Sequence, residues 1–368
     1  MDKCRDGGIK GSISYATELF DASTVERMAQ HFANLLAAVV SQPDVTLSEL
    51  DIMGQQERQL TLQVFNKTAA AYPAKLTLPQ LFEQVAARAP MAACLVAGDA
   101  QQSYAAVNTA ANQLAHWLVS RGVTAGCAVG VSLPKCPQLY IALLAVMKAG
   151  GYYVPLDPEL PAERAGYMLN QTGVRLLLAS ASAGTAELPD VQVVIIDQGW
   201  ERFRDQPMYN MRPQSEPTDL AYCIFTSGST GQPKVRQLLP ISCNSIRGSD
   251  FERSLSCCGV NRSDQRTEHA LQGVEVCHGG VINLLHYYST ATAHIPPGSM
   301  FFQTMPFIFD GSVMDVWLPL SLGCGIVVAP ADDIKDPDVA RRLIKQNRVV
   351  FLMITPSQFQ VCQNPPCS

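Results

Sequence analysis

The sequence predicts an α/β protein with a largely parallel sheet, preceded by a small α+β head. Three observations support this prediction. From residue 78 onward, strand-like and helix-like segments alternate, as they do in layered α/β folds. Hydrophobic residues make up 47% of the 368 residues and charged residues 16%, which fits a packed globular protein and excludes a disordered chain. Residues 1–60 hold only one strand-like and one helix-like segment, too little chain for a core of their own.

The head begins with an alternating pattern and continues into an amphipathic helix. Large and small side chains alternate over residues 13–17, which predicts a half-buried strand. Residues 23–26 are Ser-Thr-Val-Glu and offer a capping box for a helix with apolar residues at helical spacing. We expect that helix to end by Pro43. Residues 61–77 have no steady periodicity and are expected to form a linker.

The main body contains helices and strands in alternation. Pro137 precedes an apolar helical pattern and suits a first helical turn, where no backbone N–H is needed. Gly122 follows another helical pattern and is placed to end it. The expected helices are 78–88, 109–121 and 138–148, and the expected strands are 94–97, 128–133, 152–156, 174–178 and 193–196.

Charge and cysteine usage exclude several classes of protein. The formal net charge of -5 gives no electrostatic case for binding nucleic acid or an anionic membrane surface. The N-terminus has no apolar segment typical of a signal peptide, and the longest apolar run, residues 139–147, is too short to span a bilayer. The twelve cysteines are scattered without metal-ligand spacing. We therefore expect a cytoplasmic protein with mostly reduced thiols and no metal bound by its own side chains.

An apolar strand over residues 220–225 leads into a loop of glycines, hydroxyls and one lysine. Glycines let backbone amides converge on a phosphate, hydroxyls add donors, and a lysine adds a point charge. The spacing GxxxxGK[ST] is absent, so this is not a Walker A loop. The loop therefore indicates polyphosphate binding, and a plain serine-glycine turn is the alternative. Its candidate binding residues are Thr226, Ser227, Gly228, Ser229, Thr230, Gly231 and Lys234.

Residues 226–234 resemble the phosphate-binding signature of the adenylate-forming, or AMP-binding, superfamily. Two earlier stretches resemble further motifs of that family's adenylation domains and occur in the family's order. Residues 103–118 are similar to the opening motif, and residues 147–158, Met-Lys-Ala-Gly-Gly-Tyr-Tyr-Val-Pro-Leu-Asp-Pro, are similar to the second. Residues 11–58 resemble the C-terminal end of a condensation domain, although the HHxxxDG type of motif is absent.

The combination resembles a fragment of a nonribosomal peptide synthetase. The resemblance implies three parts: a condensation-domain remnant over residues 1–60, a linker over 61–77 and the N-terminal part of an adenylation domain over 78–368. The implied fold is the layered parallel-sheet part of an adenylate-forming domain behind a small α+β remnant. We expect no condensation activity from this chain.

The resemblance also implies a reaction. An amino-acid carboxylate attacks the α-phosphorus of ATP, and the acyl group then passes to a carrier-protein thiol. The implied cofactors are ATP and Mg²⁺, and the implied partners are an amino acid, a peptidyl carrier protein and other synthetase modules. The family's magnesium-binding glutamate motif, its catalytic lysine and the phosphopantetheine serine do not occur in this sequence. We therefore name no catalytic residue and expect the fragment to be impaired or inactive.

Residues 307–312, Phe-Ile-Phe-Asp-Gly-Ser, resemble the family's motif at the amino-acid pocket. The resemblance assigns Asp310 to the substrate's α-amino group and Gly311, Met314 and Met353 to the pocket lining. Because Asp310 follows apolar residues, we expect a carboxylate that needs a cation nearby. The alternative for Asp310 is a helix N-cap, and the alternative for the two methionines is core packing.

Residues 235–272 interrupt the pattern. The family normally continues from the loop lysine into a Gly-Val strand and a histidine, and deleting this stretch joins Lys234 to Gly273 and restores that motif through His278. The stretch begins with valine, whose codons all begin GT, and ends with glutamine, one of whose codons is CAG. It also lacks periodicity, which is unusual for so long a loop in a compact domain. We interpret it as a translated intron, and a family-specific insertion is the alternative.

Two other functions compete with amino-acid activation. The first is a different adenylate-forming ligase, such as an acyl-CoA synthetase. The condensation-like head and Asp310 argue against it, because a fatty acid has no amino group to bind. The second is a non-catalytic fragment that still binds nucleotide or a partner synthetase. These hypotheses differ in whether an adenylate forms and from which acid.

Overall fold

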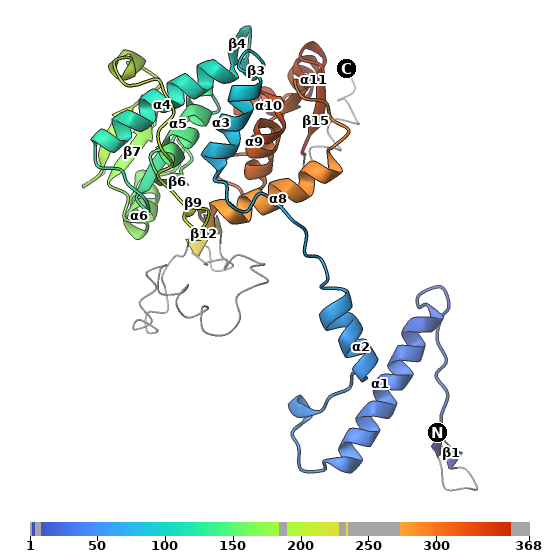
Figure 1. The fold of residues 1–368 in the computed structure, drawn as a ribbon. Coiled ribbons are helices and arrows are strands. Elements are labelled where there is room, and N and C mark those ends of the chain that lie inside the picture. The colour runs from blue at the N-terminus through green and yellow to red at the C-terminus, as the bar shows by residue number, and fades with distance from the viewer. Residues whose placement is uncertain (1, 4–8, 184–189, 228–232, 235–272, 355–368) are drawn as a thin grey trace. The chain divides into compact units, whose positions relative to one another are not determined.

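The computed structural model divides the chain into two compact units, Met1–Ala70 and Ala71–Ser368 (Figure 1). The stretch interpreted as a translated intron lies outside the described residues, and so does the centre of the predicted phosphate loop. The residues that the structure describes are 2–3, 9–183, 190–227, 233–234 and 273–354.

The first unit contains one long helix with little core around it. The helix α1 (Ala22–Ser41) is amphipathic, as predicted, yet Val25 is the only buried residue in it. A row of apolar side chains along the same helix is exposed, although residues at this spacing normally face a core. This agrees with the expectation that the head has too little chain to form a core. The exposed residues are Met28, Phe32, Leu36, Val39 and Val40.

Two local predictions for the head are wrong. Residues 13–17 form no strand, because no strand of the described chain pairs with them and an isolated strand leaves its backbone donors unpaired. The helix α1 begins at Ala22 with Asp21 as N-cap, so Ser-Thr-Val-Glu lies inside the first turns and forms no capping box. The strands present are β1 (Asp2–Lys3) and β2 (Ile9–Lys10), which pair antiparallel.

Short helical turns occupy the rest of the first unit. The 3-10 turn η1 (Leu47–Glu49) has a capping box, in which Thr46 is the N-cap. The helix α2 (Gln55–Gln59) continues directly into a π-helical turn, η2 (Leu60–Val64). The predicted linker over 61–77 therefore starts inside a helical turn before the chain becomes irregular.

A six-stranded sheet forms one half of the second unit. Its strand order is β12-β9-β6-β5-β7-β8, and every neighbouring pair is parallel except β12 on β9. Its central strands are buried, which is why they read as nearly continuous apolar runs. The predicted parallel sheet is confirmed. The strands are β5 (Ala128–Ser132), β6 (Tyr152–Pro155), β7 (Leu176–Ala179), β8 (Gln192–Ile195), β9 (Leu220–Ile224) and β12 (Val274–Cys277).

A second, five-stranded sheet has the order β15-β13-β14-β3-β4. Its pairs are parallel except the hairpin of β3 with β4. Chain segments far apart in the sequence meet here, since β3 lies beside β14. The strands are β3 (Ala93–Ala97), β4 (Ala100–Ser103), β13 (Met300–Phe302), β14 (Gly325–Val327) and β15 (Val349–Leu352).

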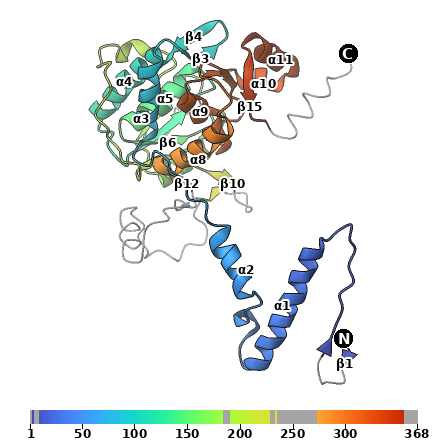
Figure 2. The ribbon, with the colours of Figure 1, turned by 45° about the vertical axis from the view of Figure 1, so that its right-hand side comes forward.

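Helices separate and cover the two sheets (Figures 1 and 2). The helix α5 (Pro137–Lys148) is buried at ten successive residues and contacts β5 and β6 of the first sheet and β3 of the second. The helix α9 (Gly311–Leu322) is buried at nine residues and contacts β13 and β14. Both helices therefore belong to the interior. Further elements are α3 (Leu78–Arg88), α4 (Tyr104–Ser120), α6 (Ala162–Gln171), α8 (His278–Ala291), α10 (Ala331–Lys335), α11 (Pro337–Gln346) and the 3-10 turn η3 (Trp200–Phe203).

The predicted boundaries of α3 and α5 agree with the structure, but α4 begins earlier than expected. Ser103 caps α4 by accepting a hydrogen bond from the backbone N–H of Ala106 over 3.2 Å, so Tyr104 is already helical. Within the described part of the chain, none of these helices combines the length and apolarity that a bilayer span requires.

Candidate active site

The predicted phosphate loop begins at the end of β9, a buried strand between β6 and β12. Two short strands follow, β10 (Thr226–Ser227) and β11 (Pro233–Lys234), and they pair antiparallel. In this register Thr226 lies opposite Lys234 and Ser227 lies opposite Pro233. The two ends of the loop are thus held side by side. The candidate residues between them, Gly228, Ser229, Thr230 and Gly231, lie outside the described residues.

The chain that follows the atypical stretch returns to the same strand. In β12, Val274 lies opposite Ile224 of β9, and Glu275 lies opposite Cys223. Burial raises the pKa of the Glu275 carboxyl. The motif residues 273–278 therefore form the edge strand directly beside the start of the phosphate loop.

His278 is the first residue of α8 and is fully buried. Its Nδ1 accepts a hydrogen bond from the backbone N–H of Leu78 over 3.4 Å, and its Nε2 lies 3.5 Å from the Ser215 hydroxyl oxygen. Burial lowers the pKa of the ring to about 4, so the neutral form is favoured. His278 thereby joins the start of α3 to the chain segment that leads into β9.

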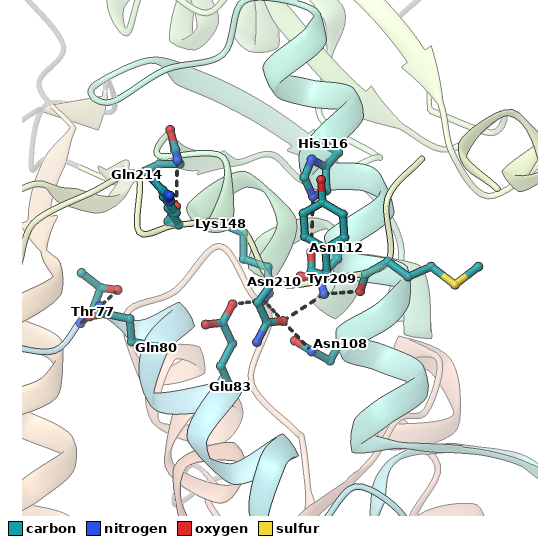
Figure 3. Close-up of polar contacts among 12 residues, drawn as sticks. Thr77, Gln80, Glu83, Asn108, Asn112, His116, Lys148, Tyr209, Asn210 and Gln214 are labelled. Carbon is teal, nitrogen blue, oxygen red and sulfur yellow. Dashed lines mark hydrogen bonds and ion pairs between the residues drawn. The ribbon is translucent and has the colours of Figure 1, made fainter. Parts of the chain in front are cut away.

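That segment, residues 207–219, has neither helix nor strand and crosses α4 and α5; we name it the crossing segment. Figure 3 shows Asn108, Asn112 and Lys148 pointing toward its Asn210. The side-chain amides of Asn108 and Asn112 donate to the Asn210 Oδ1 over 2.7 and 2.9 Å. Asn112 also donates to the backbone carbonyl of Met208 over 2.7 Å. The opening motif of the sequence thus holds the segment that positions β9 and its loop.

The second motif supports the same segment from α5. The ammonium of Lys148, whose side chain is 1% exposed, pairs with the Glu83 carboxylate and lies 3.4 Å from the Asn210 Oδ1. Burial lowers the Lys148 pKa, and Glu83 opposes that shift. Gly150 has a φ of +89°, and a Cβ there would lie 2.9 Å from the Cβ of Gln214. The motif needs glycine at this position because of both its backbone conformation and the close approach of the crossing segment.

A shallow hollow lies beside this ion pair, between α3 and the crossing segment. It holds none of the predicted site residues, so we interpret it as a gap in packing rather than as the active site. Its lining includes Thr77, Gln80, Glu83, Lys148, Gln214 and Ser215.

Asp310 is the N-cap of α9, and its Oδ1 accepts a hydrogen bond from the Gly311 N–H over 2.8 Å. The expectation of an apolar environment for this carboxylate is wrong. Asp310 is exposed, and so is Phe309 before it, because the chain reaches the surface where α9 begins. No ion pair joins Asp310 to a lysine, arginine or histidine among the described residues.

The other predicted pocket residues differ in burial. Met314 is 6% exposed and packs with the core cluster, while Met353 is partly buried just after β15. The backbone carbonyl of Met353 accepts a hydrogen bond from the Thr304 hydroxyl. A Cβ on Gly311 would make an ordinary 3.7 Å contact with the Met305 side chain, so a larger residue fits there sterically.

Aromatic side chains that the sequence did not single out connect the two halves of the site. The rings of Tyr153 in β6 and Tyr222 in β9 stack at a centroid distance of 5.5 Å. Trp317 of α9 donates its indole N–H to the Tyr153 hydroxyl over 3.4 Å. Burial raises the pKa of Tyr222, and the carboxylate charge of Asp310 is among the smaller causes that raise it further. Asp310 therefore lies within electrostatic reach of the strand that leads into the phosphate loop.

The donors present fit a nucleotide better than a metal ion. Hydroxyls, backbone amides and a lysine at the β10–β11 hairpin suit a polyphosphate. Among the described residues, no group of three His, Cys, Asp or Glu side chains could hold a metal ion.

Comparison with protein families agrees with this architecture. The family model described as AMP-binding enzyme matches residues 82–238 and 271–367, and the condensation domain model matches residues 2–62. The chain therefore belongs to the AMP-binding enzyme family, and a fragment of a condensation domain precedes that part. Residues 239–270 lie between the two matched ranges.

The curated relatives belong to peptide synthetases. A linear gramicidin synthase protein of Brevibacillus parabrevis is 32% identical over 358 residues, which cover 97% of this chain and 4% of the relative. Tyrocidine synthase 3 of the same organism is 31% identical over 96% of this chain and 5% of the relative. A plipastatin synthase protein of Bacillus subtilis (strain 168) is 32% identical over 95% of this chain and 9% of the relative. The chain thus spans less than a tenth of the length of these relatives.

Solved structures of nonribosomal peptide synthetases have the same fold. A crystal structure of the synthetase FmoA3 superposes with a TM-score of 0.73 at 26% identity, covering 93% of this chain and 32% of that one. Its AMPPNP-bound form gives a TM-score of 0.72 at 26% identity with the same coverage. The resemblance to nonribosomal peptide synthetases and the predicted fold class are both confirmed.

Proposed function

We propose that this chain contains the nucleotide-binding part of an amino-acid-activating adenylation domain. The observation that supports the proposal most directly is that both candidate halves of the site gather at β9. The β10–β11 hairpin continues from its end, and Asp310 lies within electrostatic reach of its Tyr222. A nucleotide and an acid must meet at one place for an adenylate to form.

In this proposal the loop residues bind the phosphates of ATP. Backbone amides and hydroxyls at the β9 end, together with the lysine charge, would neutralise the phosphates and orient the α-phosphorus for in-line attack. The carboxylate oxygen of the amino acid forms the new bond to phosphorus while pyrophosphate leaves. Mg²⁺, when bound, supplies further charge neutralisation on the phosphate oxygens. The residues concerned are Thr226, Ser227, Gly228, Ser229, Thr230, Gly231 and Lys234.

Asp310 would bind the α-ammonium group of the amino acid. Its exposure suits this role, because a substrate must reach the carboxylate before it can pair with it. The N-cap bond to Gly311 fixes one carboxylate oxygen and so orients the group without neutralising its charge. We place Gly311, Met314 and Met353 along the apolar wall that receives the substrate side chain.

The same proposal assigns the parts of the chain. Residues 1–60 are a condensation-domain remnant, 61–77 a linker and 78–368 the adenylation part, with a peptidyl carrier protein and other synthetase modules as partners. We propose that residues 235–272 are a translated intron that impairs nucleotide binding. The gap in the family match over 239–270 and the return of the chain to β9 at β12 support this.

Amino-acid-dependent exchange of pyrophosphate into ATP tests the proposed function. It is measured with a panel of amino acids and fatty acids on the full chain and on a form lacking 235–272. The expected result is exchange with one amino acid in the form lacking 235–272 and weaker exchange in the full chain, lost in Asp310→Asn but kept in the exposed-residue control Asp332→Asn. Exchange with fatty acids alone would favour an acyl-CoA synthetase. If both forms show no exchange and do not bind AMPPNP, the assignment is refuted and a non-catalytic fragment remains.

A further inference from the structure

Between β13 and the Asp310 motif, the chain makes a turn over residues 303–305, which we name the 303–305 turn. Two charged side chains bind its backbone. The carboxylate oxygen Oδ2 of Asp315 accepts hydrogen bonds from the N–H groups of Thr304 and Met305 over 3.2 and 3.0 Å. The ammonium of Lys135 donates to the carbonyl of Thr304 over 2.8 Å and lies 3.5 Å from that of Gln303.

The two side chains come from different parts of the fold. Lys135 lies in the connection between β5 and α5, at the carboxyl edge of the six-stranded sheet. Asp315 lies in α9, and the turn itself follows β13 of the five-stranded sheet. Lys135 therefore connects a loop of one sheet to a turn of the other.

Side chains of the turn extend these contacts toward the proposed amino-acid pocket. The Thr304 hydroxyl donates to the backbone carbonyl of Met353, and the Gln303 amide donates to the carbonyl of Met305. The Tyr140 hydroxyl lies 3.4 Å from the Gln303 Oε1. A displacement of the turn would therefore move Met353 and the start of the Asp310 motif together.

The positions of these charges, Asp315 buried and Lys135 half-buried, argue against a role in packing alone. Asp315 is 4% exposed, and burial raises its pKa to about 6, against the two N–H donors and Lys135, which lower it. Burial lowers the pKa of Lys135 to about 8, against the charge of Asp315. No ion pair joins them within the described residues, so each interacts directly with backbone groups instead. An apolar side chain would avoid the desolvation penalty but could not bind the turn.

We propose that Lys135 and Asp315 are positioning residues for the amino-acid half of the site. They fix the backbone of the 303–305 turn and through it the placement of Asp310 and Met353. The inference rests on the proposed function, since it assumes that those two residues contact the amino acid. Neither Lys135 nor Asp315 touches the substrate in this scheme.

The test uses the full chain and the form lacking 235–272, which is proposed to bind nucleotide better, and it makes two kinds of measurement on each. The variants are Asp315→Ala and Lys135→Met, with Asp315→Asn and Lys135→Arg as conservative partners that remain informative if the first pair fails to fold. Asp332→Asn and Lys335→Met are matched controls, because their side chains are 93% and 75% exposed. Backbone hydrogen exchange is followed at Thr304 and Met305. The dissociation constants of AMPPNP and of the proteinogenic amino acids are measured separately.

Asp315→Ala is expected to speed exchange at the two amides by roughly tenfold or more, since it removes their charged acceptor. The amino-acid dissociation constant should rise by about tenfold in both non-conservative variants, with AMPPNP binding unchanged within about twofold. Asp315→Asn keeps an acceptor oxygen, so its amide exchange and its amino-acid dissociation constant should change less than those of Asp315→Ala.

Equal losses of amino-acid and nucleotide affinity, or unchanged exchange at Thr304 and Met305, would overturn the inference in favour of a general structural role. A wild-type chain that binds AMPPNP but no amino acid would end the assignment of the turn to an amino-acid pocket. Failure of the proposed function itself has a different signature, because the wild-type sequence would then bind neither ligand, with or without residues 235–272.

Discussion

The buried histidine between α3 and the crossing segment should make the second unit sensitive to acid. His278 is fully buried, its Nδ1 accepts the Leu78 N–H and its Nε2 faces Ser215. Protonation of Nδ1 would replace that acceptor with a donor facing a donor. The perturbation that isolates this effect is His278→Asn, whose side-chain oxygen can still accept from Leu78 but cannot titrate.

The magnitude follows from the difference between the two pKa values. Burial lowers the pKa of His278 from the ordinary 6.5 to about 4. Below pH 6.5 the unfolded chain therefore takes up a proton that the folded chain does not. The contribution of His278 to stability is complete above pH 6.5 and is lost as the pH falls to about 4. At 1.36 kcal/mol for each pKa unit, the loss amounts to about 3 kcal/mol.

Urea unfolding between pH 7 and pH 4, followed by tryptophan fluorescence, measures this loss. The three tryptophans, Trp117, Trp200 and Trp317, all lie in the second unit, so the signal reports its unfolding. His278→Asn should be less stable than wild type at pH 7. The difference in the free energy of unfolding between the two proteins should shrink by about 3 kcal/mol as the pH falls. His286→Asn, a partly exposed histidine of the same helix, is the control. Parallel pH profiles for wild type and His278→Asn would refute the argument.

Three further predictions concern the same unit. Lys148→Met should lower the free energy of unfolding by about 3–5 kcal/mol, since it leaves the Glu83 carboxylate without its buried partner. In urea titrations, adding Glu83→Gln should restore part of the lost stability. Gly150→Ala should cost more than Gly122→Ala; both have positive φ, but only the first has atoms within 4 Å of the added Cβ. Equal melting temperatures for the two glycine variants would contradict this. Sequencing of spliced transcripts should find a major form without the codons for 235–272, and a major form that keeps them would contradict the intron hypothesis.

Local sequence signals predicted several buried elements in the first half of the second unit, but not the long helices α6, α8, α9 and α11. The helix α5 and the strands β5 to β7 were placed within two residues at most ends, because continuous apolar runs between glycines leave few alternatives. The shortest strands of the five-stranded sheet were not predicted. The strands β13 and β14 have three residues each, too few for a periodic pattern. Residues 13–17 have a strand pattern without a partner, and pairing rather than pattern decides whether a strand forms.

For the site, the sequence identified motifs but not their neighbours. It predicted a phosphate loop directly after the strand that the structure shows as β9. It also gave an N-cap as one of two roles for Asp310, and the structure shows that N-cap at the start of α9. It predicted the wrong environment for that carboxylate, because apolar neighbours in the sequence do not determine which residues reach the surface. Lys135 and Thr304 are 169 residues apart, so their contact depends on the packing of two sheets that no local pattern encodes.

Each of the two sheets positions one half of the proposed site. In the six-stranded sheet, β9 ends where the phosphate loop begins. The crossing segment and His278 hold that strand from the α3 side. In the five-stranded sheet, β13 ends at the 303–305 turn, and the chain then leads to Asp310. The two halves meet where Lys135 binds the turn and where Trp317 reaches Tyr153. Since both contacts span the sheets, a shift of one sheet against the other would change the distance between nucleotide and amino acid. In the proposed function, the spacing required for in-line attack would therefore be set by interior packing as well as by the loops.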